Sequence, residues 1–116
     1  MKTNLNPGET QGIYEVTERA YERSNTAVQF FDFPAKDGIT VGYVLGEFTE
    51  RQWHRYNMTD GGVGCRWWIL TVMQGLAQYC LRDPDSIEDV LAVNLQYSWH
   101  RNNPPIALPI QKGTFF

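Results

Sequence analysis

The sequence predicts an α+β fold in which a small antiparallel sheet packs against about three helices, the helix at residues 65–81 being central. Three observations support this prediction. A long apolar run follows a glycine-rich loop, a helical spacing of apolar residues precedes that loop, and β-branched and aromatic residues are concentrated upstream. The chain has 116 residues, of which 42% are hydrophobic and 14% aromatic, so we expect a single globular domain over residues 1–116.

The strands of this sheet are expected near the two ends of the chain. Residues 12–21 alternate as a half-buried strand does, although their apolar members would also line one side of a helix. Residues 28–33 are β-branched and aromatic and stop at Pro34, which favours a second strand. The tail at residues 106–116 is too apolar for a free end, so we expect it to add an edge strand.

Three helices are expected between these strands. Over residues 40–52 apolar side chains fall at positions i, i+3, i+4 and i+7, the spacing of one helical face. The central helix is expected to run from Cys65 to Leu81, because this segment is apolar on nearly every side. A third helix is expected to begin near Ser86 and to end before the Asn-Asn-Pro-Pro segment at residues 102–105, since proline interrupts a helix.

Charge and composition argue against several classes of function. The formal net charge is −3 and the ten basic residues are scattered, which argues against nucleic-acid binding. No signal peptide is evident, and no apolar segment approaches the roughly 20 residues of a membrane helix. Two cysteines and two histidines without paired spacing do not match a zinc site. We therefore expect a soluble, cytoplasmic protein with no metal and no other cofactor.

Cys65 stands at the expected start of the central helix, directly after Gly61-Gly62-Val63-Gly64. Free amides at a helix N-terminus and the positive end of the helix dipole stabilise an anion such as a thiolate. A tight turn into a buried helix explains the same glycines without chemistry, so Cys65 is either a nucleophile or a packing residue. A nucleophile needs a base, and the chain offers only His54 and His100, which could equally lie on the surface at helix ends.

Arg66 follows in the first turn of the same helix, where a positive charge opposes the helix dipole and needs another reason to be present. One interpretation is that Arg66 holds an anionic substrate or stabilises a thiolate. The other, which we favour, is an ion pair with Asp32, Glu47 or Asp60.

Four tryptophans are a high count for this length, and they flank the histidines and the cysteine: Trp53, Trp67, Trp68 and Trp99. Buried indoles usually supply packing area, so a place in the core is the simplest interpretation. Trp67 and Trp68 are adjacent, however, and point about 100° apart on a helix, so both cannot face one core. We expect one of them to line an aromatic-walled pocket or a subunit contact; such a pocket suits a planar or hydrophobic small molecule.

The segment from Tyr56-Asn57-Met58 through Gly62-Val63-Gly64-Cys65-Arg66-Trp67-Trp68 resembles an uncharacterised domain family of filamentous fungi. Its members carry a tyrosine–asparagine pair and then a Gly-x-Gly-Cys-Arg-aromatic-Trp run. Members of that family are similar to proteins encoded near fungal secondary-metabolite genes, so the resemblance implies work on small molecules. The positions that the motif carries over are Tyr56, Asn57, Gly62, Gly64, Cys65, Arg66 and Trp68.

The pattern of that family begins with a further strand carrying Asn-His-aromatic residues, before the segment that matches residues 2–5. The resemblance therefore implies that this chain is shortened at its N-terminus. A histidine on that strand beside Cys65 would resemble a circularly permuted papain-like site, and its loss argues against such a hydrolase. A lost strand also leaves an edge and an apolar face that a second copy can cover, so we expect a homodimer.

The leading functional prediction is a cofactor-independent small-molecule enzyme or binding protein of fungal specialised metabolism, such as one that cyclises or isomerises a hydrophobic intermediate. Aromatic walls would hold the reactive conformer, and Tyr56, Asn57, Arg66 or a histidine would stabilise developing charge. A second hypothesis is a hydrolase or acyltransferase in which Cys65 attacks an acyl group and a histidine is the base. A third is a non-catalytic module whose exposed aromatic residues meet a protein partner.

Overall fold

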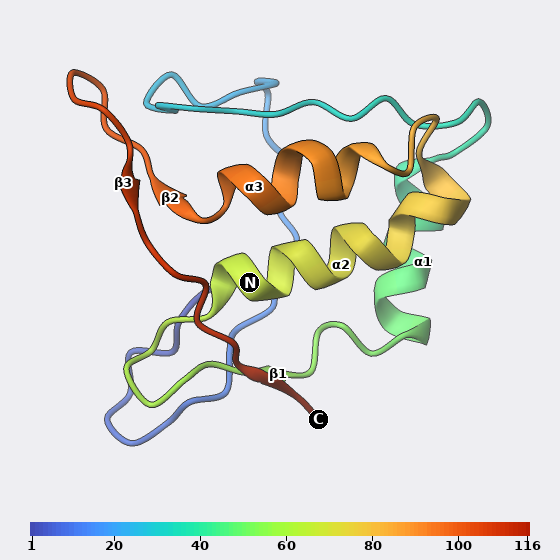
Figure 1. Cartoon of the computed structure of the whole chain (residues 1–116). Helices are drawn as coiled ribbons and strands as arrows, with labels where there is room; N and C mark the ends of the chain where they lie inside the picture. Colours follow the sequence, from blue (N-terminus) through green and yellow to red (C-terminus); the bar gives the residue numbers. More distant parts are fainter.

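The long helix α2, Cys65–Cys80, is the element around which the rest of the chain is arranged (Figure 1). The computed structural model describes residues 1–116. Helix α1, Val41–Glu50, precedes α2, and a π-helical turn η1, Ile87–Leu91, follows it and continues into α3, Ala92–Asn94. The η1–α3 segment lies alongside α2 (Figure 1). The predicted α+β class and the central position of α2 are confirmed. No helix combines the length and apolarity needed to cross a membrane.

The strands form two small antiparallel sheets instead of one. β1, Tyr56–Asn57, pairs with β4, Thr114–Phe115, and β2, Tyr97–Ser98, pairs with β3, Ile106–Ala107. The apolar tail, from which one edge strand was expected, therefore supplies a strand to each of the two sheets. β1 lies in the connection between α1 and α2, so the first sheet reaches the segment that leads into the central helix (Figure 1).

Two isolated bridges extend the β1–β4 sheet towards the N-terminus. Gln11 bridges Asn57, and Lys2 bridges Ile13, both in the antiparallel sense. The N-terminal segment, the middle of the chain and the tail thus meet in one hydrogen-bonded layer. We call this layer, formed by residues 2 and 11–13 with β1 and β4, the terminal sheet.

The strands predicted at residues 12–21 and 28–33 are wrong, apart from the bridge at Ile13. No backbone hydrogen bond joins residues 14–21 or 28–33 to another part of the chain. β-branched and aromatic residues favour an extended backbone, but a strand also needs a partner, and neither segment has one. Phe31 and Phe33 instead pack by their side chains against the helices.

The third predicted helix is shorter than expected. It starts as η1 and ends with α3 at Asn94, after which the chain enters β2. The Asn-Asn-Pro-Pro segment does not stop a helix here. It lies between β2 and β3 and forms the turn of a hairpin, a role that proline and asparagine also favour.

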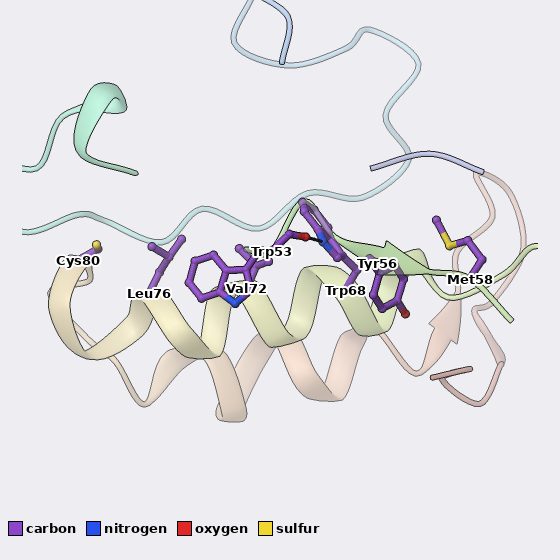
Figure 2. Close-up of a cluster of buried hydrophobic side chains, with 7 residues drawn as sticks. All are labelled: Trp53, Tyr56, Met58, Trp68, Val72, Leu76 and Cys80. Carbon is purple, nitrogen blue, oxygen red and sulfur yellow. Dashed lines mark hydrogen bonds between the residues drawn. The ribbon is translucent and has the colours of Figure 1, made fainter. Parts of the chain in front are cut away.

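Two hydrophobic clusters share α2, one on each side. The first consists of Trp53, Tyr56, Met58, Trp68, Val72, Leu76 and Cys80. The second consists of Leu70, Ala77, Leu81, Ile87 and Leu91. Figure 2 shows the first cluster as a row along α2. Its four members from α2 itself, Trp68, Val72, Leu76 and Cys80, follow one another at intervals of four residues. Burial on two sides explains why the sequence of α2 is apolar almost all round.

Helix α1 ends in a Schellman motif with an unusual residue in the left-handed position. Gln52 has φ = 57°, and its N–H donates to the carbonyl of Thr49 at 3.2 Å. The N–H of Trp53 donates to the carbonyl of Phe48 at 3.0 Å, and their rings pack 5.5 Å apart. These are the two hydrogen bonds and the apolar contact of the motif, in which glycine usually takes the place of Gln52.

We expect Gln52→Gly to raise the free energy of unfolding by about 0.5–1 kcal/mol, because a β-carbon costs energy in the left-handed region. Urea denaturation with an unchanged m-value measures the effect. Gln78→Gly is the matched control, since Gln78 is exposed within α2, and there the same exchange should cost about 1 kcal/mol. A loss of stability in both variants would contradict the prediction.

Candidate functional site

The largest cavity of the protein lies at the start of α2, between the glycine loop and the C-terminal tail. Its volume of about 480 Å³ falls within the range of small-molecule pockets. It is lined by Thr3, Gly62, Val63, Gly64, Cys65, Arg66, Leu108, Pro109 and Gln111. The structure therefore brings the predicted residues Cys65 and Arg66 into one cavity.

The glycine loop turns into α2 through backbone conformations that favour glycine. Gly62 has φ = 72° and Gly64 has φ = 140°. A β-carbon on Gly64 would lie 2.9 Å from the hydroxyl of Tyr56, so the loop also needs glycine for its close approach to that ring. The loop is closed by a 2.8 Å hydrogen bond from the N–H of Thr59 to the carbonyl of Val63. These glycines are therefore explained by the tight turn into α2, and they need no chemical role.

Tyr56 fastens this loop to the tail. Its side chain is fully buried, and its ring packs 4.8 Å from that of Phe115. The hydroxyl donates to the carbonyl of Gly64 at 2.8 Å and accepts from the N–H of Gly113 at 2.8 Å. Tyr56 was expected to contact a substrate, but the structure places its hydroxyl between two backbone groups. Its neighbour Asn57 is half-buried in β1.

Arg66 connects the segments on the other side of the cavity by hydrogen bonds. Its guanidinium donates to the carbonyl of Leu95 at 2.5 Å, just after α3, and to the carbonyls of Leu108 and Pro109 at 3.0 and 3.2 Å. One side chain of α2 therefore joins the end of α3 to the tail. The aliphatic wall of the cavity is positioned by these hydrogen bonds.

The ion pair that we favoured for Arg66 is not formed, and that prediction is wrong. Asp32 and Glu47 each pair with another arginine, and Asp60 makes no ion pair. The guanidinium instead donates to three main-chain carbonyls, one directly after α3 and two in the tail. Nothing in the sequence near Arg66 marks these acceptors, because they lie 29 to 43 residues away.

Cys65 is half-buried in the wall of the cavity. Its sulfur lies 3.9 Å from the carbonyl oxygen of Met1 and 4.0 Å from the sulfur of Met58. These contacts are apolar or weak, and the side chain makes no hydrogen bond with a basic group. The thiol is therefore available to a molecule in the cavity but has no base beside it.

Neither histidine lines this cavity. The ring of His54 packs against Tyr14, with centroids 6.1 Å apart. His100 is exposed beyond β2, with its Nε2 3.4 Å from the hydroxyl of Ser98. The structure thus keeps both predicted bases out of the site that contains Cys65.

None of the four tryptophans lines the cavity either. Trp53 and Trp68 belong to the first cluster, where the indole N–H of Trp68 donates to the carbonyl of Trp53 at 2.6 Å (Figure 2). Trp67 is half-buried and touches both clusters, and Trp99 is half-buried beside the hairpin. The two adjacent indoles do diverge, but the cavity that we find has aliphatic walls and not the aromatic walls that we expected.

Sequence reasoning missed five of the lining residues: Thr3, Val63, Leu108, Pro109 and Gln111. Thr3 comes from the N-terminal segment, where its hydroxyl donates to the carbonyl of Gly62 at 2.7 Å. Three others come from the tail. Its apolar composition was the available signal, but it indicated only that the tail packs somewhere.

We expect the protein to lose stability at alkaline pH, because a thiol and a phenol are buried in its core. Burial raises the pKa of the Cys80 thiol above its ordinary 9.0 and the pKa of the Tyr56 hydroxyl above its ordinary 10.0. Because each pKa is higher in the folded state, the stabilisation is complete below the unfolded value and is lost as pH rises through the folded value. We expect the free energy of unfolding to be level near pH 7 and to fall above about pH 9.

Urea denaturation at pH 7, 9 and 10.5 measures this loss. Cys80→Ala lowers stability at every pH because it leaves a cavity, but it should remove the part of the decline that begins near pH 9. A free energy of unfolding that stays level to pH 10.5 would show that both groups ionise in the folded protein at their ordinary values.

Comparison with known proteins supplies a family and no activity. A family model described as a domain of unknown function, DUF7770, matches residues 1–116. No curated protein and no solved structure matches the chain. The match covers the glycine loop, α2 and the tail, so all walls of the cavity lie within the domain that defines the family.

Proposed function

We propose, for a chain that belongs to the DUF7770 family of domains of unknown function, that the cavity at the start of α2 binds a small, largely apolar organic molecule. This proposal keeps the leading sequence prediction and moves its site from the tryptophans to the cavity. The observation that carries it is the wall, where Val63, Leu108 and Pro109 face a few polar groups in about 480 Å³. Small-molecule sites commonly have this size and mixture of groups.

The arrangement favours holding and polarising a molecule over covalent catalysis. An apolar wall can hold one conformer of a flexible molecule, and the guanidinium of Arg66 can stabilise negative charge that develops on it. We therefore propose cyclisation or isomerisation of a hydrophobic intermediate, or its binding alone, without a cofactor. A role in fungal specialised metabolism is part of this proposal and rests on the motif around Cys65.

A second candidate is a thiol enzyme, which one observation favours: the half-buried sulfur of Cys65 lies in the wall of the same cavity. The sulfur would attack the carbonyl carbon of an ester or thioester, forming a thioester with Cys65 while the bond from that carbon to the alcohol or thiol of the substrate breaks. The leaving alcohol or thiol would take the proton of the sulfur, directly or through solvent, since no histidine lines the cavity. Water or a second substrate would then accept the acyl group. This candidate requires iodoacetamide to label Cys65 faster than the buried Cys80, and requires a bound molecule to protect it.

The expected homodimer and the non-catalytic module stay proposals. Leu5, Val41 and Tyr79 are 91%, 77% and 60% exposed, and exposed apolar side chains support contacts with another chain. Neither proposal needs the cavity, so either is compatible with a small-molecule site.

The test of the proposed function is binding of the neutral, apolar fluorophore N-phenyl-1-naphthylamine. We expect saturable binding to the wild type and at least tenfold weaker binding to Val63→Trp, because the indole would fill the cavity. Val93→Trp is the matched control, since Val93 in α3 is 49% exposed, Val63 is 50% exposed, and Val93 is not in the wall. Absent binding to the wild type, or equal weakening in both variants, would refute the proposal.

A further inference from the structure

The charge of the cavity indicates which kind of apolar molecule it takes. Arg66 is the one charged residue among those that line it. It is also the one half-buried arginine of the seven in the chain, the others being exposed. The cavity therefore has a positive charge in its wall and no negative charge to balance it.

Arg66 differs from the other partnered arginines in what it contacts. Arg23, Arg51 and Arg82 each pair with a carboxylate. Arg66 contacts only main-chain carbonyls, which satisfy hydrogen bonds but do not cancel a charge. A partly buried cation without a counter-ion is unfavourable, and an anion beside it is correspondingly favoured.

The guanidinium also has hydrogen-bond capacity left. Both N–H groups of its Nη1 are used by carbonyls, and its Nη2 makes one hydrogen bond. Of the five donors of an arginine, one on Nη2 and the one on Nε have no partner in the protein. Two free donors on one planar group match the two oxygens of a carboxylate.

Resting on the proposed function, we propose that the ligand of this cavity is an amphipathic organic acid. Its carboxylate pairs with Arg66, and its apolar body lies against Val63, Leu108 and Pro109. A single positive charge balances a monoanion better than a phosphate dianion, which would bring an unmatched negative charge into an apolar wall.

The test compares decanoate with decan-1-ol, which have the same chain and differ in the charge of the head group. In this assay each compound competes with N-phenyl-1-naphthylamine for the wild type at pH 7.5, where the carboxylate of decanoate is ionised. We expect decanoate to bind at least tenfold more tightly than the alcohol, and Val63→Trp to weaken both.

Gln111 allows the charge of the wall to be changed without substituting Arg66, because it lines the cavity and makes no hydrogen bond with the guanidinium. Gln111→Glu is expected to weaken the binding of decanoate at least tenfold more than it weakens the binding of decan-1-ol. Gln111→Lys is expected to tighten the binding of decanoate. Gln78→Glu makes the same change of net charge on the exposed side of α2, away from the cavity, and should affect neither molecule.

Three results would overturn the inference. If the alcohol binds as tightly as decanoate and Val63→Trp weakens both, the cavity is a small-molecule site without preference for acids. If Gln78→Glu weakens decanoate as much as Gln111→Glu does, the preference comes from the net charge of the protein. If neither molecule nor the fluorophore binds, the proposed function itself fails.

Discussion

Tyr56→Phe is expected to lower the free energy of unfolding by about 1–3 kcal/mol, although it removes a single oxygen atom. That oxygen is buried and joins two backbone groups, the carbonyl of Gly64 and the N–H of Gly113, each at 2.8 Å. Without it, the carbonyl of Gly64 keeps its 3.1 Å hydrogen bond from the N–H of Trp68, but the half-buried N–H of Gly113 loses its partner. Leaving a buried donor unsatisfied costs about 1–3 kcal/mol, and the N–H of Gly113 accounts for most of the expected effect.

Urea denaturation of the wild type and of Tyr56→Phe measures this cost. Tyr79→Phe is the control, because Tyr79 is 60% exposed and its hydroxyl makes no hydrogen bond within the protein. We expect that control to stay within about 0.5 kcal/mol of the wild type. A Tyr56→Phe variant as stable as the control would mean that water takes the place of the hydroxyl, and that the loop and the tail are held by other contacts.

The second large effect is expected at Gly75, where alanine should lower the free energy of unfolding by about 1–3 kcal/mol. In an ordinary helix the same exchange raises stability by about 1 kcal/mol. Here a β-carbon would overlap the indole of Trp53 and lie 2.9 Å from its Cη2 atom. Trp53 is buried against Phe48, with ring centroids 5.5 Å apart, so the indole has no room to withdraw.

Gly46→Ala is the matched control for Gly75→Ala, and the comparison depends on a difference of sign. Gly46 lies within α1, and a β-carbon there would meet nothing within 4 Å. We expect this variant to gain about 1 kcal/mol while Gly75→Ala loses stability. If both variants gained, the indole of Trp53 would have to move freely, and the first cluster would be less tightly packed than its contacts indicate.

Helices α1 and α2 were predictable because their signals are local. The apolar residues of α1 repeat with helical spacing and follow Thr40, whose hydroxyl accepts from the N–H of Tyr43 at 3.1 Å. The sequence of α2 is apolar on both the sides that the structure buries. In each case the information lies within one or two turns of the helix, where sequence periodicity records it.

The strands were not predictable in the same way, because a strand is defined by its partner. Residues 28–33 have strong β propensity and form no strand, whereas β1 has only two residues and pairs on both sides. Propensity reports how well a residue fits a sheet once the neighbouring strand is present. It does not report which segment the fold brings alongside.

The candidate site was predictable only where the motif passes through it. Cys65 and Arg66 lie in the wall because they begin α2, and that position could be inferred from the glycines before them. The aliphatic residues Leu108 and Pro109 reach the same wall through the hydrogen bonds of Arg66. Such long-range contacts depend on the whole fold, so no local pattern recorded them.

The terminal sheet joins segments that leave the ribosome at very different times. Beside this sheet, the hydrogen bond from Gly113 to Tyr56 spans 57 residues, and at the cavity the hydrogen bond from Arg66 to Pro109 spans 43. The packing of α2 against η1, by contrast, needs only neighbouring parts of the chain. Local contacts form quickly and distant ones slowly, so the helix pair can assemble on the nascent chain. The cavity, to which the tail contributes Leu108, Pro109 and Gln111, is then completed last, after synthesis of the tail.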